Sequence, residues 1–120
     1  MKAWVLLLVL LLVACGEEVK EIPNEVYDLR EAGVNVLGID RNYVETLVLY
    51  EPLGSEQDMI VDIGIIAGYM YQSGTFDKLK IQVERDETEI YSIIIARDDI
   101  EDYEYDQIDV NEFVSRWEFV

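Results

Sequence analysis

The sequence predicts an α+β fold: an antiparallel sheet of about four strands, arranged as two hairpins, with one long buried helix across it. Two pairs of segments rich in β-branched and aromatic residues, within 34–50 and 76–97, each have a polar turn in the middle. An apolar segment of helical length, residues 55–72, lies between the pairs. With 120 residues, of which 51% are hydrophobic, the chain is long enough for one domain with a packed core.

Short helices are expected at both ends of the domain. Asn24 is a suitable helix cap, and Gly33 can end the helix that follows it. Near the other end, the sequence predicts a short acidic helix at about 99–105 and a last helix at about 110–117. A turn around Asp106 would separate these two helices.

The two predicted hairpins differ in how completely their strands should be buried. Residues 34–39 and 43–50 form the first, and Asn42 in its turn is able to take a positive φ. In the second, polar and apolar residues alternate over 76–85, which predicts a half-buried strand. The partner strand contains three consecutive isoleucines, residues 93–95, which predict a central strand covered on both faces.

The long helix has a recognisable beginning and an unusual composition. The segment from Ser55 to Asp58 fits the S-x-x-D capping box. Because the helix is apolar on nearly all sides, we expect it to be covered on more than one side. Gly64 and Gly68 share one stripe, which favours close packing of the helix on the sheet. The alternative is homodimerisation through the same stripe.

Charge and composition exclude several functional classes. The chain has 26 Asp and Glu, 9 Lys and Arg, and a formal net charge of −17. A chain so acidic is repelled by phosphate backbones, so we expect no nucleic-acid binding. It has no His, which is the commonest general base and a usual zinc ligand. Its single Cys cannot form an internal disulfide.

The N-terminus carries the strongest functional signal. Lys2 precedes an uncharged apolar run of signal-peptide length, too short to span a bilayer, that ends in Leu-Val-Ala-Cys at residues 12–15. This ending resembles the lipobox of bacterial and archaeal lipoproteins. The resemblance implies cleavage after Ala14, lipidation of the Cys15 thiol and an extracytoplasmic protein anchored to a prokaryotic membrane. The alternatives are an uncleaved anchor, a plain secretory signal or a core helix with a buried thiol.

The lipobox divides the chain into three parts. Residues 1–14 would be the signal peptide, residues 15–23 the lipidated cysteine with a short polar tether, and residues 24–120 a single α+β domain. The leader contains Lys2 and no acid. Its removal would therefore leave 8 basic side chains against 26 acidic ones in the mature protein.

An acidic stretch near the C-terminus is the one candidate metal site. Residues 98–112 contain eight acids and no base, and calcium binds six to eight oxygens. The EF-hand spacing is absent, so the favoured interpretation is a solvated acidic face with helix N-termini that prefer acids. The candidate calcium ligands are Asp98, Asp99, Glu101, Asp102 and Asp106.

Together these features favour a lipid-anchored binding or accessory module without catalytic activity. Its expected partner is another protein, possessing a basic surface and met through the sheet face or the acidic C-terminal region. A homodimer is a further possibility. The alternative functions are a cation- or small-ligand-binding lipoprotein that uses residues 98–109, and an enzyme of unknown type such as a carboxylate-based hydrolase. No cofactor other than calcium is suggested.

Overall fold

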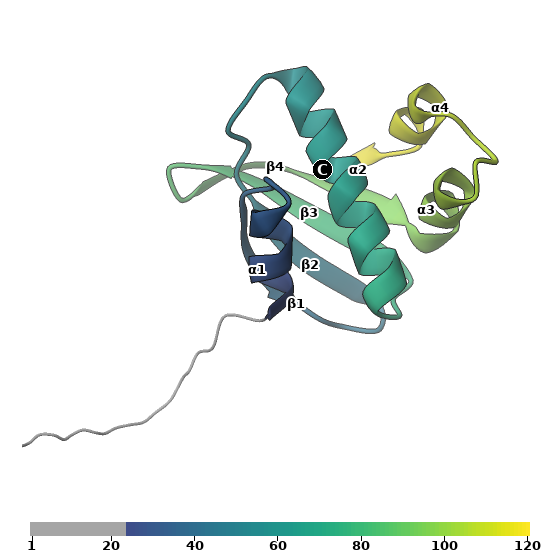
Figure 1. The fold of residues 1–120 in the computed structure, drawn as a ribbon, viewed down its shortest axis with the longest axis horizontal. Helices are drawn as coiled ribbons and strands as arrows, with labels where there is room; N and C mark the ends of the chain where they lie inside the picture. Colours follow the sequence, from purple (N-terminus) through teal and green to yellow (C-terminus); the bar gives the residue numbers. More distant parts are fainter. Residues whose placement is uncertain (1–23) are drawn as a thin grey trace, which may run out of the picture.

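A computed structural model describes residues 24–120, which form an α+β domain with a five-stranded sheet (Figure 1). The expected α+β class is confirmed. The predicted leader, Ala14, Cys15 and the tether at 15–23 lie outside the described residues. In chain order the elements are α1 (Asn24–Glu31), β1 (Val36–Asp40), β2 (Glu45–Tyr50), α2 (Glu56–Ser73), β3 (Lys78–Arg85), β4 (Thr88–Ala96), α3 (Arg97–Glu104), α4 (Val110–Ser115) and β5 (Glu118–Phe119).

The sheet corrects the predicted one in strand number and in direction. Its order is β1-β2-β3-β4-β5, and the central pair β2 and β3 is parallel, whereas the other three pairs are antiparallel. The 18 residues of α2 explain the parallel pair, because the helix carries the chain back to the end of the sheet where β2 begins. The fifth strand has two residues, too few for a period-2 pattern to reveal it.

Helix α2 has the predicted beginning, and its burial is asymmetric. The Ser55 hydroxyl accepts the Asp58 backbone N–H, and the Asp58 carboxylate accepts the Ser55 backbone N–H, which completes the capping box. One side of the helix is fully buried in the core. A second side packs against α3, as the apolar composition predicted. On a third side, the side chain of Val61 is 61% exposed and that of Ile65 is 38% exposed.

Helices α1 and α2 cover one face of the sheet, and the core lies between these helices and that face (Figure 1). Along β3 the buried side chains that face the helices alternate with exposed or partly exposed ones on the opposite face, whereas in β4 this alternation is interrupted at Ser92, which is buried next to Ile93. Ile94 belongs to that opposite face, so only Ile93 and Ile95 of the isoleucine run are buried. The largest buried side chains are Tyr50, Phe76, Phe113, Leu29, Ile63, Ile66, Met70, Leu79, Ile81, Ile93, Ile95 and Ile100.

The buried tyrosine is held by the one acid within the apolar segment of α2. Tyr50 is fully buried, and its hydroxyl donates to the Asp62 carboxylate at 2.6 Å. A buried hydroxyl without a partner would destabilise the fold by about 1–3 kcal/mol. Burial, and then the bond to Asp62, raise the pKa of Tyr50 far above its ordinary value. Asp62 of α2 thus provides the hydrogen-bond acceptor for the buried hydroxyl of Tyr50 in β2.

The two glycines of α2 face α3 rather than the sheet, which corrects the predicted packing. A Cβ at Gly64 would lie 3.9 Å from the ring of Tyr103, and one at Gly68 would lie 2.7 Å from a carboxylate oxygen of Glu104. Both neighbours belong to α3. The stripe is therefore used for a helix-helix contact within the chain.

We predict that Gly64→Ala stabilises the domain by about 0.5–1 kcal/mol, since alanine favours a helix interior and its Cβ makes an ordinary contact here. Urea unfolding monitored by circular dichroism measures this change. Gly68→Ala is the matched control, and its gain should be smaller because the Glu104 carboxylate must move aside. A loss of stability in Gly64→Ala would contradict the described contact with α3.

Candidate functional site

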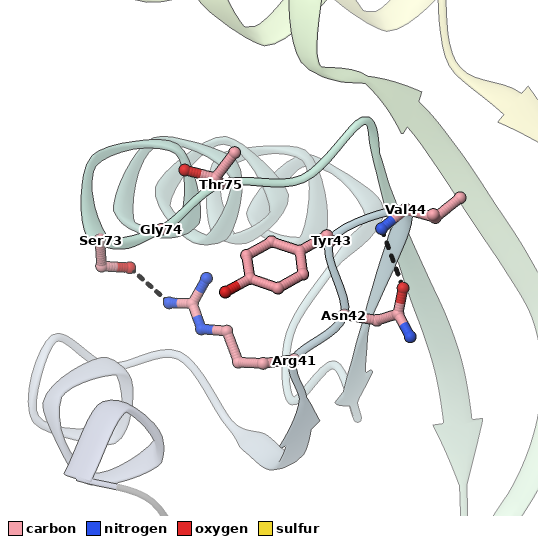
Figure 2. Close-up of a pocket in the computed structure, with 7 residues that line it drawn as sticks. All are labelled: Arg41, Asn42, Tyr43, Val44, Ser73, Gly74 and Thr75. Carbon is pink, nitrogen blue, oxygen red and sulfur yellow. Dashed lines mark hydrogen bonds between the residues drawn. The ribbon is translucent and has the colours of Figure 1, made fainter.

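The largest hollow described on the domain lies where two loops meet at one end of the sheet. One loop joins β1 to β2, and the other joins α2 to β3 (Figure 2). Because β2 and β3 are parallel, their first residues lie together, and the Lys78 N–H donates to the Val44 carbonyl at 2.9 Å. The hollow measures about 550 Å³ and is lined by Arg41, Asn42, Tyr43, Val44, Ser73, Gly74 and Thr75.

Arg41 is the charged group of the hollow, and two residues, Glu25 and Ser73, hold its guanidinium. Its guanidinium forms an ion pair with Glu25 of α1, and Nη2 also donates to the Ser73 hydroxyl at 2.7 Å. That hydroxyl in turn donates to the Tyr69 carbonyl at 2.7 Å. A Cβ at Gly74 would overlap Nη1, so glycine is what lets the guanidinium lie against this loop. The side chain remains 30% exposed.

The loop between β1 and β2 is shaped by Asn42. Its side-chain oxygen accepts the Val44 N–H at 2.8 Å, and its backbone exchanges two hydrogen bonds with the Thr46 hydroxyl. The backbone of Asn42 does not adopt the positive φ that asparagine is able to take, because its side chain makes the turn instead. As a result Tyr43 projects from the loop and is 81% exposed. Figure 2 draws its ring between the side chains of Arg41 and Val44.

A second contact joins α1 to α2 beside the hollow. The Tyr69 hydroxyl donates to the Asp28 carboxylate at 2.7 Å. This hydrogen bond, with a smaller contribution from burial, raises the pKa of Tyr69 to about 12. Together with the contacts of Arg41, it ties the first helix to the C-terminal end of α2. The hollow is therefore built on a polar network that spans α1, the first hairpin and α2.

The chemistry of the lining groups suits recognition more than proton transfer. The seven lining residues supply a guanidinium, two aliphatic hydroxyls, an amide and a phenol. They supply no carboxylate, and the nearby carboxylate of Glu25 is paired with Arg41. Such a set can donate hydrogen bonds to a polar ligand and stack on an apolar one.

Part of the acidic stretch is paired with an arginine. Arg116 lies between two of the candidate ligands and donates through Nη1 to both Asp99 and Asp102 at 3.1 Å, and through Nε to Glu112 at 3.1 Å. Hydrogen bonds to Glu112 and Asp99 raise the pKa of Arg116. Residues 24–120 contain no group of three or more His, Cys, Asp or Glu side chains arranged to hold a metal ion.

The other three candidate ligands point into solvent from separate positions. Asp98 and Glu101 are exposed on α3, and Asp106 is exposed in the turn after it, with a φ of 60°. The predicted turn around Asp106 and the short helices on both sides of it are confirmed. Asp109 caps α4 by accepting the Glu112 N–H at 2.8 Å. Helix capping and pairing with arginine thus account for several of the acids.

Comparison of the chain with protein-family models, with curated protein sequences and with solved structures finds no match. Over the described part of the chain, none of the helices combines the length and the apolar composition needed to cross a membrane.

Sequence reasoning missed the residues of the hollow. Arg41 and Ser73 lie 32 positions apart, and only the parallel arrangement of β2 and β3 brings them together. The sequence does contain one indication of this site, since Arg41 is one of only nine basic residues and lies in a predicted turn. An arginine and an exposed tyrosine in the same turn are typical of recognition surfaces.

The raised pKa of Tyr69 predicts a pH-dependent loss of stability. Because its folded pKa is about 12 and its ordinary value is 10.0, its contribution is complete below pH 10 and is lost as the pH rises toward 12. Phenolate absorbance, compared between the wild type and Tyr69→Phe, measures this titration. Asp28→Ala should lower the pKa of Tyr69 toward 10, whereas Glu31→Ala on the same helix should not. An unchanged profile in Asp28→Ala would exclude the described bond as the cause.

Proposed function

We propose that this protein is a lipid-anchored extracytoplasmic module that binds another protein and has no catalytic role. The lipobox-like segment ending in Ala14-Cys15 supports the anchor, which would consist of acyl chains on the Cys15 thiol. Two or more acyl chains are sufficient for stable attachment to a bilayer. The acidity of the mature chain would keep the domain from lying flat on an anionic membrane.

The observation that carries the binding role is the exposed Tyr43 beside the fixed guanidinium of Arg41. Tyrosine and arginine are enriched where proteins bind one another, because each combines apolar contact area with hydrogen-bond donors. Ser73 and Glu25 already hold the guanidinium, so little side-chain entropy remains to be lost on binding. Val44, 64% exposed next to Tyr43, adds apolar area at the same rim.

A cation-binding lipoprotein is the weaker candidate. The Arg116 guanidinium already neutralises Asp99 and Asp102, two of the five acids that such a site would use. Binding calcium there would require displacement of that guanidinium, which lowers the net gain. The acidic region is better suited to a partner protein with a basic surface.

Replacement of the predicted lipidation site tests the anchor. We expect Cys15→Ser to abolish incorporation of a labelled fatty acid and to release the chain from membranes washed at alkaline pH. Ala3→Ser, a substitution elsewhere in the leader, should leave both unchanged. A Cys15→Ser chain that still partitions wholly with washed membranes would overturn the lipid anchor.

Photo-crosslinking tests the binding surface at the hollow. A photoreactive phenylalanine analogue in place of Tyr43 should give one discrete heavier adduct in cells, and Arg41→Met should weaken that adduct at least several-fold. The matched control carries the analogue in place of Tyr27, which is 52% exposed on α1. Equal adduct yields from the two positions, or an adduct that Arg41→Met leaves unchanged, would argue against a partner at the hollow.

A further inference from the structure

A second depression, separate from the hollow, is lined almost wholly by apolar groups. It lies between the N-terminal half of α2 and the corner formed by α3 and α4, and it measures about 280 Å³. We call it the groove. Its lining residues are Ile60, Val61, Gly64, Ile65, Tyr103 and Val110.

The groove exists because α2 is apolar on more sides than the domain covers. Ile63 and Ile66 are buried in the core, whereas Val61 and Ile65, four positions apart, face outward. Tyr103 of α3 approaches Gly64, whose missing side chain leaves the floor of the groove open. Across from α2, Val110 at the start of α4 is 43% exposed. Val61, Ile65 and Val110 thus gather exposed aliphatic side chains in one depression and are not scattered singly over the surface.

Acidic residues lie next to the groove residues of α3 and α4 in the sequence. Asp106 and Asp109 are exposed in the segment that leads from Tyr103 to Val110. Glu104 follows Tyr103 and lies beside Gly68, one turn of α2 beyond the groove floor. Within residues 24–120, none of these three acids forms an ion pair, since Arg116 bonds with Asp99, Asp102 and Glu112. Although Asp109 also caps α4, no cation pairs with these acids within residues 24–120, so the apolar groove has a negative rim.

We propose that the groove binds an amphipathic helix with a basic polar face, contributed by a partner protein. An apolar groove between helices recognises side chains spaced three and four residues apart on one face of an incoming helix. The negative rim selects lysine and arginine beside those anchors and repels anionic lipid headgroups. This inference rests on the proposed binding function and adds to the hollow a second surface, with the chemistry of the partner that it would bind.

The test uses the full-length chain in a neutral detergent and two fluorescent synthetic peptides. One is a helical peptide with leucines on one face and lysines on the other, and the second has the same composition in scrambled order. Binding is measured by fluorescence anisotropy at about 0.15 M salt, because this salt concentration weakens purely electrostatic binding. We expect the amphipathic peptide to bind at least about tenfold more tightly than the scrambled one.

Paired variants locate the binding on the groove. The double variant Val61→Gln with Ile65→Gln should bind the amphipathic peptide about tenfold more weakly than the wild type. Its melting temperature should be unchanged. Leu53→Gln is the control, because Leu53 is 77% exposed in the loop before α2. Asp106→Asn with Asp109→Asn should weaken binding and reduce its salt dependence.

Asp40→Asn with Glu45→Gln provides a charge-matched control at exposed positions in the first hairpin. This variant should bind the amphipathic peptide more tightly than Asp106→Asn with Asp109→Asn does, although both remove two charges. Equal losses in the two double variants would show that net charge alone drives binding.

Three other outcomes would overturn the proposal: no binding of the amphipathic peptide, equal affinity for both peptides, or full affinity in the Val61 and Ile65 variant. A concentration-dependent dimer that this variant abolishes would identify a second copy of the chain as the occupant and would also overturn it. Acylation of Cys15 and crosslinking at position 43 are independent measurements. If both succeed while peptide binding fails, the groove assignment is wrong and the proposed function stands.

Discussion

The burial of one side of α2, the helix that connects the parallel strands β2 and β3, constrains the rest of the structure. The helix must carry the chain from the end of β2 back to the level where β2 began, and it buries Ile63, Ile66 and Met70 on the way. This return places the end of α2 beside the first hairpin and so creates the hollow. The same geometry turns Val61 and Ile65 away from the sheet and creates the groove.

Three arginine side chains connect neighbouring elements of an otherwise acidic domain. Arg41 ties α1 to the end of α2, and Arg116 ties α3 to α4. Arg97 donates to the carbonyls of Tyr71 and Gly74 at 3.2 and 3.0 Å, and its guanidinium lies 4.3 Å from the centre of the Tyr71 ring. Each forked guanidinium can satisfy several acceptors at once, which suits a chain with few bases.

Features determined by neighbours in sequence could be predicted, and features determined by distant contacts could not. The capping box at Ser55 depends on residues three apart, and Gly33 ends α1 with a φ of 92° for a local reason. The direction of β3 relative to β2 depends on where an 18-residue helix ends in space. Likewise, nothing near Arg41 in sequence indicates that Glu25 is its partner.

If Cys15 carries the proposed lipid, the ion pair between Glu25 and Arg41 also sets how far the hollow can stand from the membrane. Glu25 is ten residues after Cys15, and a fully extended chain spans at most about 3.5 Å per residue. With Cys15 acylated, the hollow would lie within roughly 35 Å of the bilayer surface. The groove, beside the other half of α2, belongs to a different part of the domain. Under the two proposals, a partner at the hollow would lie near the bilayer, while a basic helix from a second protein would occupy the groove.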